Sequence, residues 1–203
     1  MAAKKQQVRL IFKLGAFGAF IMLGYLGIRN YKDSVEKLRV NGCIDEIGEI
    51  TLNIRDRFSN NVYTGLDYKS ASDLQIFPKK MFKEGYREAL NSYMGGVDLF
   101  PSALGPKSPE NAFEVSFQGL SQRGCMDLIR MNWENSSFLI AVAGYRVATP
   151  SGVLDEIYPE TKQEDIKNYN IFKGNGARFA SDDKLKDACQ CDDDTCTVVW
   201  KFR

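Results

Sequence analysis

Histidine is absent from this 203-residue sequence. Histidine is the side chain that most often moves protons near neutral pH, and it is the commonest metal ligand in proteins. Its absence excludes hydrolases built on a Ser-His-Asp or Cys-His arrangement. The sequence has many carboxylates, but no pair is marked by its neighbours as an acid and a base. We therefore expect a protein that is not an enzyme and that has no cofactor.

A strong charge of either sign is also missing. Twenty-seven Lys and Arg residues balance 26 Asp and Glu residues, which leaves a formal net charge of +1. A nucleic-acid-binding protein usually shows a clear excess of positive charge. The composition therefore predicts no nucleic-acid partner.

Acidic residues are absent from the whole N-terminal region before Asp33. This region contains an apolar run over residues 10–28, preceded by the basic residues Lys4, Lys5, Arg9 and Lys13. Such a run is long enough to enter a bilayer, and basic residues before it favour an N-terminus in the cytoplasm. The pattern predicts a single-pass membrane protein whose remaining chain is exported. The run is long for a signal peptide, so we expect either a retained anchor or a short clipped leader followed by a retained helix.

Helical spacing of apolar residues continues beyond this run as far as Phe58. The pattern predicts one helix from about Val8 to Phe58, with its first half in lipid and its second half packed on a globular domain. A phase shift near Gly42 indicates a bend or loosening there. We therefore expect three parts: a basic N-terminus and membrane-spanning half helix (1–30), an amphipathic half helix (31–60) and a globular domain (61–203).

The globular part mixes strand and helix patterns. Residues 112–118 alternate, with Phe113, Val115 and Phe117 facing inward and Glu114, Ser116 and Gln118 facing outward. Ser121 is expected to cap a helix that reaches Trp133, and a brief helix is expected to open at Ser70. Residues 138–147 and 197–202 are expected to be strands, and short helices are expected at Thr161 and Ser181. These patterns indicate an α+β fold.

Five cysteines occur, at positions 43, 125, 189, 191 and 196. In an exported domain they are more often disulfides than zinc ligands, and an odd number leaves one over. Cys43 is expected to be a small buried residue of the long helix, although it could instead reach the C-terminal cysteines. The acidic run at 192–194 is expected to be a solvated turn, since it lacks the spacing of a calcium loop. The sequon at Asn135 has meaning only in a eukaryotic secretory route.

Three segments carry a resemblance to type IVb pilins and pilin-like proteins with a PilS-type pilin domain. They are ITLNIRDRFSNNVYTGLDYKSASDLQIFPKKMF, AFEVSFQGLSQRGCMDLIRMNW and ACQCDDDTCTVVWKFR. The resemblance implies a pilin-like α+β fold in which a long N-terminal helix, membrane-embedded in its first half, packs on an antiparallel β-sheet. It also implies a disulfide from Cys125 to Cys191 or Cys189. The short spacing then favours a local bond between Cys196 and the remaining cysteine of the pair.

The resemblance also implies cleavage of a leader after a glycine, and Gly15 is the best candidate, with Ala16 as the new N-terminus. The glutamate that follows this cut in pilins would fall at Phe20. A minor or tip subunit, or a permanently anchored pilin-like component of a secretion or conjugation apparatus, therefore fits at least as well as a major pilin.

Small residues in the apolar run suggest how such a subunit could assemble. Glycines at 15, 18, 24 and 27 have spacings that allow close helix–helix contact in a membrane. We expect Gly18, Phe20, Gly24 and Gly27 to contact other pilin-like subunits or a secretion apparatus, in the inner membrane or in a surface pilus. The alternative is a single-span anchored extracytoplasmic binding or adhesin domain that does not polymerise.

Overall fold

The computed structural model describes residues 2–105, 107–131, 133, 139–143, 169–173, 182–191 and 195–203. For residues 2–26, 59, 139–143 and 169–173 the description covers the backbone and not the side chains. The chain divides into two compact units, Met1–Leu38 and Arg39–Arg203. Each unit is described below by itself.

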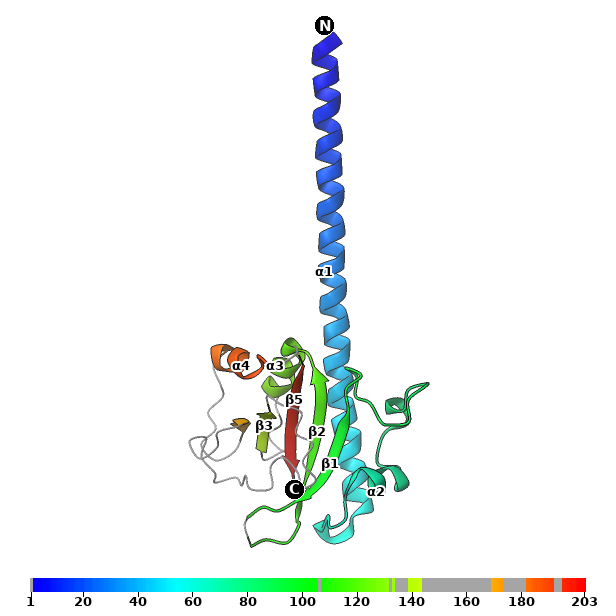
Figure 1. Cartoon of the computed structure of the whole chain (residues 1–203), viewed down its shortest axis with the longest axis vertical. Helices are drawn as coiled ribbons and strands as arrows, with labels where there is room; N and C mark the ends of the chain where they lie inside the picture. Colours follow the sequence, from blue (N-terminus) through cyan, green and yellow to red (C-terminus); the bar gives the residue numbers. More distant parts are fainter. Residues whose placement is uncertain are drawn as a thin grey trace. The chain divides into compact units, whose positions relative to one another are not determined.

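Helix α1 (Ala2–Arg57) is one continuous α-helix of 56 residues, in agreement with the single long helix that the sequence predicts (Figure 1). The helical assignment passes through Gly42 without interruption. The bend or loosening expected near Gly42 therefore does not break the helix. Arg55 and Arg57 lie in its last turn, where positive charge is favourable next to the helix C-terminus. Among the residues that the structure describes, no helix is both long and apolar enough to cross a bilayer.

Five strands form one antiparallel sheet in the part of the chain that the structure describes. They are β1 (Val97–Ser102), β2 (Ala112–Leu120), β3 (Leu139–Ala143), β4 (Tyr169–Lys173) and β5 (Cys196–Phe202). Their order across the sheet is β1-β2-β5-β3-β4. Figure 1 shows β5 between β2 and β3. The last strand along the chain therefore lies in the middle of the sheet, between β2 and β3.

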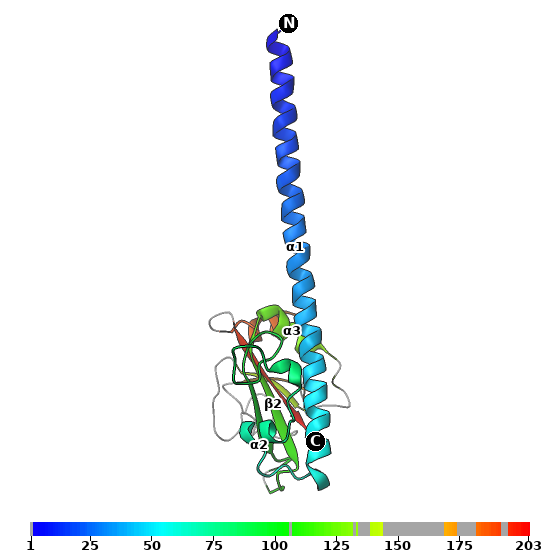
Figure 2. The same cartoon turned by 90° about the vertical axis from the view of Figure 1, so that its right-hand side faces the viewer.

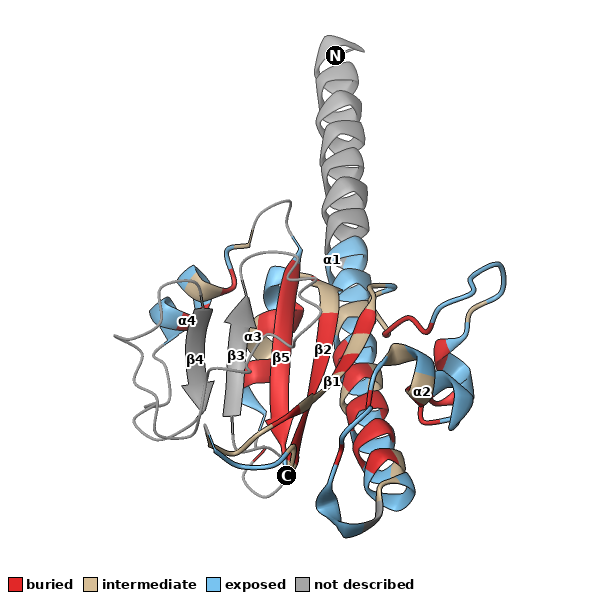
Figure 3. Cartoon of the chain, turned by 60° about the horizontal axis from the view of Figure 1, so that its bottom comes forward, coloured by how far each residue is buried: buried red, intermediate tan, exposed pale blue. Residues whose placement is uncertain are grey.

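The second half of α1 packs one apolar face against this sheet. Cys43, Ile47, Ile50 and Ile54 recur every three or four residues and are all at most 1% exposed. They share one core with the inward side chains of β2 and β5, namely Phe113, Val115, Phe117, Val198, Trp200 and Phe202. Figure 3 shows the buried residues along one side of this half of the helix. Burying each such side chain is worth roughly 1.5–3 kcal/mol, so this contact is the main source of the domain's stability.

Between α1 and β1 the chain makes short elements that fill one end of the core. They are the 3₁₀ turns η1 (Ser59–Asn61) and η2 (Lys79–Met81) and helix α2 (Tyr68–Asp73). Helix α2 begins slightly earlier than the sequence suggested, because Asp67 caps it. The Asp67 carboxylate accepts a hydrogen bond from the Ser70 N–H, and the Ser70 hydroxyl accepts one from the Asp67 N–H.

At the same end, the C-terminal backbone is attached to α1. The Arg55 Nε and Nη2 atoms donate to the Arg203 carbonyl oxygen at 3.0 and 2.6 Å. Figure 2 shows the C-terminus next to the last turns of α1. This contact holds the end of β5 close to the end of the helix.

The alternation expected along β2 is present, but its outward face does not meet solvent. Glu114 and Ser116 are only 0% and 2% exposed, so other parts of the chain cover the outward face of β2. On the same face of β5, Val199 and Lys201 are also fully buried. The central strands β2 and β5 are therefore buried on both faces.

Two helices flank β5 at one end of the sheet. Helix α3 (Gln122–Arg130) begins after Ser121, whose side chain accepts a hydrogen bond from the Gly124 N–H at 2.9 Å, as predicted. Helix α4 (Asp182–Ala188) matches the helix expected after Ser181. Trp133 lies beyond the end of α3, and its indole N–H donates to the Leu128 carbonyl. Several sequence expectations lie outside the described residues. They are the sequon at 135–137, the helix at Thr161, the turn at 192–194 and the strand residues beyond Ala143.

Gly42 is needed in α1 because another part of the chain comes very close. A Cβ atom at Gly42 would collide with the side chain of Ser92, whose own Cβ would be only 2.9 Å away. Gly48, in the same helix, has no atom within 4 Å of such a Cβ and is exposed. The two glycines therefore differ in surroundings while sharing the same backbone geometry.

We predict opposite effects of alanine at these two positions. Gly42→Ala is expected to lower the free energy of unfolding by about 1–3 kcal/mol, because Ser92 must move. Gly48→Ala, the matched control, is expected to raise it by up to about 1 kcal/mol, since alanine is the better helix former. Denaturant unfolding of the full chain in detergent, followed by the fluorescence of the buried Trp133 and Trp200, measures both. Stabilisation by both substitutions would contradict the close approach of Ser92.

Candidate functional site

The N-terminal half of α1 carries the residues that the sequence singled out for processing and assembly. Gly15, Ala16, Gly18, Phe20 and Gly24 all lie in helical backbone, as does Gly27. Gly24 and Gly27 are three residues apart, which places them on the same helix face. A Cβ atom at Gly27 would meet nothing within 4 Å. Contacts within the chain therefore do not require a glycine at position 27.

Large apolar side chains are exposed along α1. Ile28, Tyr31 and Leu38 are 60%, 70% and 70% exposed, and Leu52 in the second unit is 67% exposed. Isolated exposed apolar residues are normal on a protein surface, but several along one helix favour a surface that another helix can cover. The structure therefore leaves α1 with apolar side chains available for contacts outside the chain.

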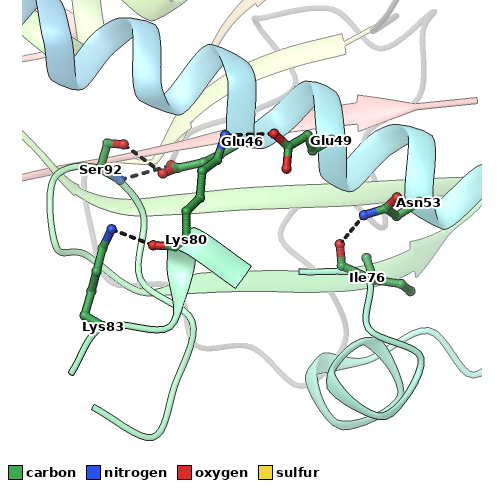
Figure 4. Close-up of polar contacts among 7 residues, drawn as sticks. All are labelled: Glu46, Glu49, Asn53, Ile76, Lys80, Lys83 and Ser92. Atoms are coloured by element: carbon green, nitrogen blue, oxygen red, sulfur yellow. Dashed lines mark hydrogen bonds and ion pairs between the residues drawn. The ribbon is translucent and has the colours of Figure 1, made fainter. Parts of the chain in front are cut away.

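A loop between η2 and β1 is attached to the buried side of α1 by a single carboxylate. The Glu46 side chain, 1% exposed, accepts hydrogen bonds from both the N–H and the hydroxyl of Ser92, at 3.0 and 2.7 Å. Figure 4 shows both bonds, together with an ion pair of 2.9 Å between Lys80 and Glu49 on the same side of the helix. We call residues 91–96 the clasp loop.

The clasp loop is held on its other side by Asn91. The Asn91 side-chain amide donates to the Gln118 carbonyl of β2 at 2.8 Å. Its oxygen accepts from the N–H groups of Tyr93 and Gly95, at 2.8 and 3.1 Å. A Cβ atom at Gly95 would collide with the Gln118 backbone, so glycine is required there. The loop thus joins α1 to strand β2 through polar contacts at both ends.

Tyr93 extends this connection to α3. The Arg39 guanidinium lies 5.6 Å from the centre of the Tyr93 ring, an arrangement that favours a cation–π contact. The phenol tip lies so close to Gly124 that a Cβ atom there would overlap it. Glycine near the start of α3 therefore leaves room for the ring.

Burial raises the pKa of the Glu46 carboxyl above its ordinary value of 4.5. The two hydrogen bonds from Ser92 and the positive charges of Lys80 and Lys83 act in the opposite direction, and desolvation is the larger effect. Lys83 also donates to the Lys80 carbonyl at 2.6 Å, which keeps the two lysines together. Glu46 is therefore a buried acid whose charged form is costly.

Two disulfides close the C-terminal region. All five cysteines lie in described segments. Four of them form the bonds Cys125–Cys189 and Cys191–Cys196, while Cys43 is buried and takes part in neither disulfide. Of the two partners considered for Cys125, the structure has Cys189. This bond spans 64 residues and joins α3 to the end of α4, so the chain-entropy model gives it about 4 kcal/mol. Cys43 lies in the helix–sheet core and does not reach the C-terminal cysteines.

The described residues contain no group of three or more acidic or cysteine side chains placed to hold a metal ion. The features of this region are structural. They are a helix with exposed apolar side chains, a clasp loop hydrogen-bonded to that helix, and a C-terminal region closed by disulfides. Sequence reasoning missed Glu46 and Ser92, because a glutamate in an amphipathic helix usually faces solvent. Gly42 was the one indication in the sequence, because a glycine inside a helix can mark where another segment of the same chain comes close.

A long helix on an antiparallel sheet, with a disulfide-closed C-terminal region, defines a pilin-like protein. A family model described as PilS N terminal matches residues 39–201, which is most of the chain. The chain therefore belongs to the PilS N-terminal family. The family and the fold are structural and not enzymatic.

Solved structures of pilins are similar to this chain. TcpA, a type IV pilin from Vibrio cholerae El Tor biotype, has a TM-score of 0.55 and 15% identity, covering 82% of this chain and 99% of that one. The type IVb pilin from Salmonella typhi has a TM-score of 0.49 and 13% identity, covering 78% of this chain and 95% of that one. At 15% identity, the match to TcpA shows a shared fold only. The comparison with curated proteins gave no match.

The raised pKa of Glu46 predicts how stability should change with pH. The protonated carboxyl is stabilising below pH 4.5, and that contribution is lost as the pH rises through the raised pKa of the folded protein. Glu46→Gln carries no charge, and its side chain can still accept from the Ser92 N–H through its oxygen and donate from its NH2 group to the Ser92 hydroxyl oxygen. The variant is therefore expected to match the wild type in acid and to become relatively more stable toward pH 8.

Denaturant unfolding of both proteins at several pH values measures this difference. Ser92→Ala is the control, because it leaves Glu46 in place and removes the hydroxyl donor, which should cost about 1–3 kcal/mol. A wild type that gains stability over Glu46→Gln as the pH rises would show that the charged carboxylate is the favoured form.

Proposed function

We propose that this protein is a membrane-anchored subunit of a bacterial type IV pilus or of a related secretion or conjugation apparatus. The observation that carries the proposal is α1, a single helix that begins in the apolar N-terminal run and ends in the core of a pilin-like domain. Such a helix can be held in the inner membrane before assembly and can pack against neighbouring subunits afterwards. The exposed Tyr31, Leu38 and Leu52 side chains support contacts of that kind.

The sequence around the proposed cleavage site favours a minor or tip subunit, or an anchored pilin-like component, over a major pilin. A charged residue near a new N-terminus can align subunits by pairing with a neighbour. Cleavage after Gly15 would place the aromatic Phe20 where pilins have a glutamate, and the first acidic residue of the chain is Asp33. Assembly of this subunit would then depend on packing more than on charge.

Close packing of helices in lipid comes from small residues, because lipid tails are as apolar as leucine and hydrophobicity gives little net gain. Replacing both Gly24 and Gly27 with leucine should therefore abolish assembly or secretion. Gly27 has open space around it within the chain, so the exported domain should stay folded. Recovery of the chain in sheared pili, or secretion by the intact system, measures the effect.

The matched control is the double substitution of Gly24 and Gly27 by alanine, which keeps both positions small and should retain most assembly. Formation of the Cys125–Cys189 bond in each variant checks that the domain has folded. If the leucine variant assembles and functions normally, the helix is only an anchor. A monomeric binding or adhesin domain then becomes the better description.

Processing of the N-terminus is a separate part of the proposal. A prepilin peptidase should leave Ala16 as the first residue, and the new amino group would be methylated as in pilins. Sequencing or mass analysis of the N-terminal peptide from protein isolated in its native host measures this. An intact Met1 would overturn processing and would favour a permanent anchor.

A further inference from the structure

The two disulfides of the C-terminal region differ in their exposure to solvent. Cys125 and Cys189 are both 0% exposed and belong to the hydrophobic core. Cys196 is 1% exposed, and Cys191 alone among the four is only partly buried. A thiolate opens a disulfide by attacking one of its sulfur atoms, so access to that sulfur limits the reaction. Of the four cysteines, Cys191 is therefore the one that a thiol in solution meets first.

Both sulfur atoms of the Cys191–Cys196 disulfide lie next to a backbone carbonyl oxygen. The Cys196 Sγ is 3.2 Å from the Cys189 oxygen, and the Cys191 Sγ is 3.7 Å from the oxygen of Ala188, the last residue of α4. A disulfide sulfur has no proton, so neither contact is a hydrogen bond while the disulfide is intact. A thiol has a proton to donate, and carbonyl groups at the end of a helix lack intrahelical donors. Both carbonyls are therefore placed to accept a hydrogen bond from a reduced cysteine.

The chain is attached to the domain on both sides of this disulfide. Cys189, two residues before Cys191, is bonded to Cys125 of α3. On the other side, Cys196 begins β5 and pairs with Leu120 of β2. Only five positions along the chain separate Cys191 from Cys196. The two sulfur atoms therefore stay close together after reduction and can form the bond again.

We propose that Cys191–Cys196 is an exchangeable disulfide, which an external dithiol opens by attack at Cys191 while Cys125–Cys189 stays closed. The domain then has one permanent cross-link in its core and one reversible cross-link at its surface. Opening the reversible cross-link frees the segment between α4 and β5 and leaves the core intact. This thiol-exchange site is independent of the pilus role proposed above.

The exchange takes place in two steps. One thiolate of the dithiol attacks the Cys191 Sγ and forms a mixed disulfide with it. The bond to Cys196 breaks, and its electron pair leaves on the Cys196 Sγ, which takes a proton from water and donates it to the Cys189 carbonyl in a hydrogen bond. The second thiolate of the dithiol then attacks the dithiol's own sulfur in the mixed disulfide, and Cys191 leaves and takes up a proton. The dithiol is oxidised to a disulfide, and the cysteine pair gains two electrons and two protons.

Differential labelling of the oxidised full chain in detergent tests the proposal. The protein is treated with dithiothreitol without denaturant, blocked with N-ethylmaleimide, and then fully reduced in denaturant and labelled with iodoacetamide. Tryptic peptide 124–130 contains Cys125, peptide 187–201 contains the three C-terminal cysteines, and fragmentation locates each label. The Cys191–Cys196 pair is expected to take up N-ethylmaleimide at least about tenfold faster than the Cys125–Cys189 pair, because only the first has a partly exposed cysteine.

Cys43 reports in the same experiment whether the core stays closed, because it is 0% exposed and takes part in neither disulfide. It should react only after denaturant is added. Equal rates for the two pairs, or faster reduction of Cys125–Cys189, would overturn the proposal. Reduction of Cys191–Cys196 that needs denaturant, or that occurs only together with labelling of Cys43, would overturn it as well.

A monothiol identifies the sulfur that is attacked. With cysteamine in place of dithiothreitol, followed by excess N-ethylmaleimide, the cysteamine adduct is expected on Cys191 and the maleimide on Cys196. The opposite distribution would overturn attack at Cys191. The control variant combines Cys191→Ser with Cys196→Ser and should take up no N-ethylmaleimide at the same concentration of dithiothreitol. Labelling of Cys125 or Cys189 in a variant whose Cys43 stays unlabelled would also overturn the proposal, and the wild-type rates decide the question if the variant fails to fold.

Discussion

Burial of one face of α1 against the sheet is the contact on which the rest of the domain depends. Ile47, Ile50 and Ile54 share one core with the inward residues of β2 and β5, and α1 is the longest helix among the described residues. The short elements between α1 and β1 then close the remaining end of the core.

Polar contacts give this apolar core its specific loop arrangement. Glu46 holds Ser92, and Asn91 holds the Gln118 backbone, so the clasp loop is attached to the helix and to the sheet at once. A buried acid is unfavourable by itself, and it is tolerated here because two donors from one residue satisfy it. The geometry at Gly42 and Gly95 shows how closely the chain must approach itself to make these bonds. The loop is fixed by hydrogen bonds where its backbone is too irregular to be fixed by a strand ladder.

Much of the fold was predictable from the periodicity of apolar residues. The spacing of three or four residues indicates a helix face at Cys43, Ile47, Ile50 and Ile54. The spacing of two indicates a strand face at Phe113, Val115 and Phe117. The capping role of Ser121 could also be predicted from the sequence, since it depends on residues nearby in the chain. Long-range polar contacts were not predictable. Glu46 looked like a solvated helix residue, and Glu114 looked like an outward-facing strand residue, because local patterns do not show what lies over the second face of a sheet. The disulfide partner of Cys125 was narrowed to two residues two positions apart, and only the structure distinguishes them.

The position of β5 in the sheet has a consequence for how the domain matures. This strand is the last along the chain, yet it lies between β2 and β3 and supplies Val198, Trp200 and Phe202 to the core. While residues 196–202 are still being synthesised or exported, β2 has a partner on one side only, and the apolar faces of α1 and β2 stay open to water. The domain therefore cannot fold stepwise as it emerges. Its earlier segments must wait, protected from aggregation, until the final strand arrives and completes the sheet in a single late event.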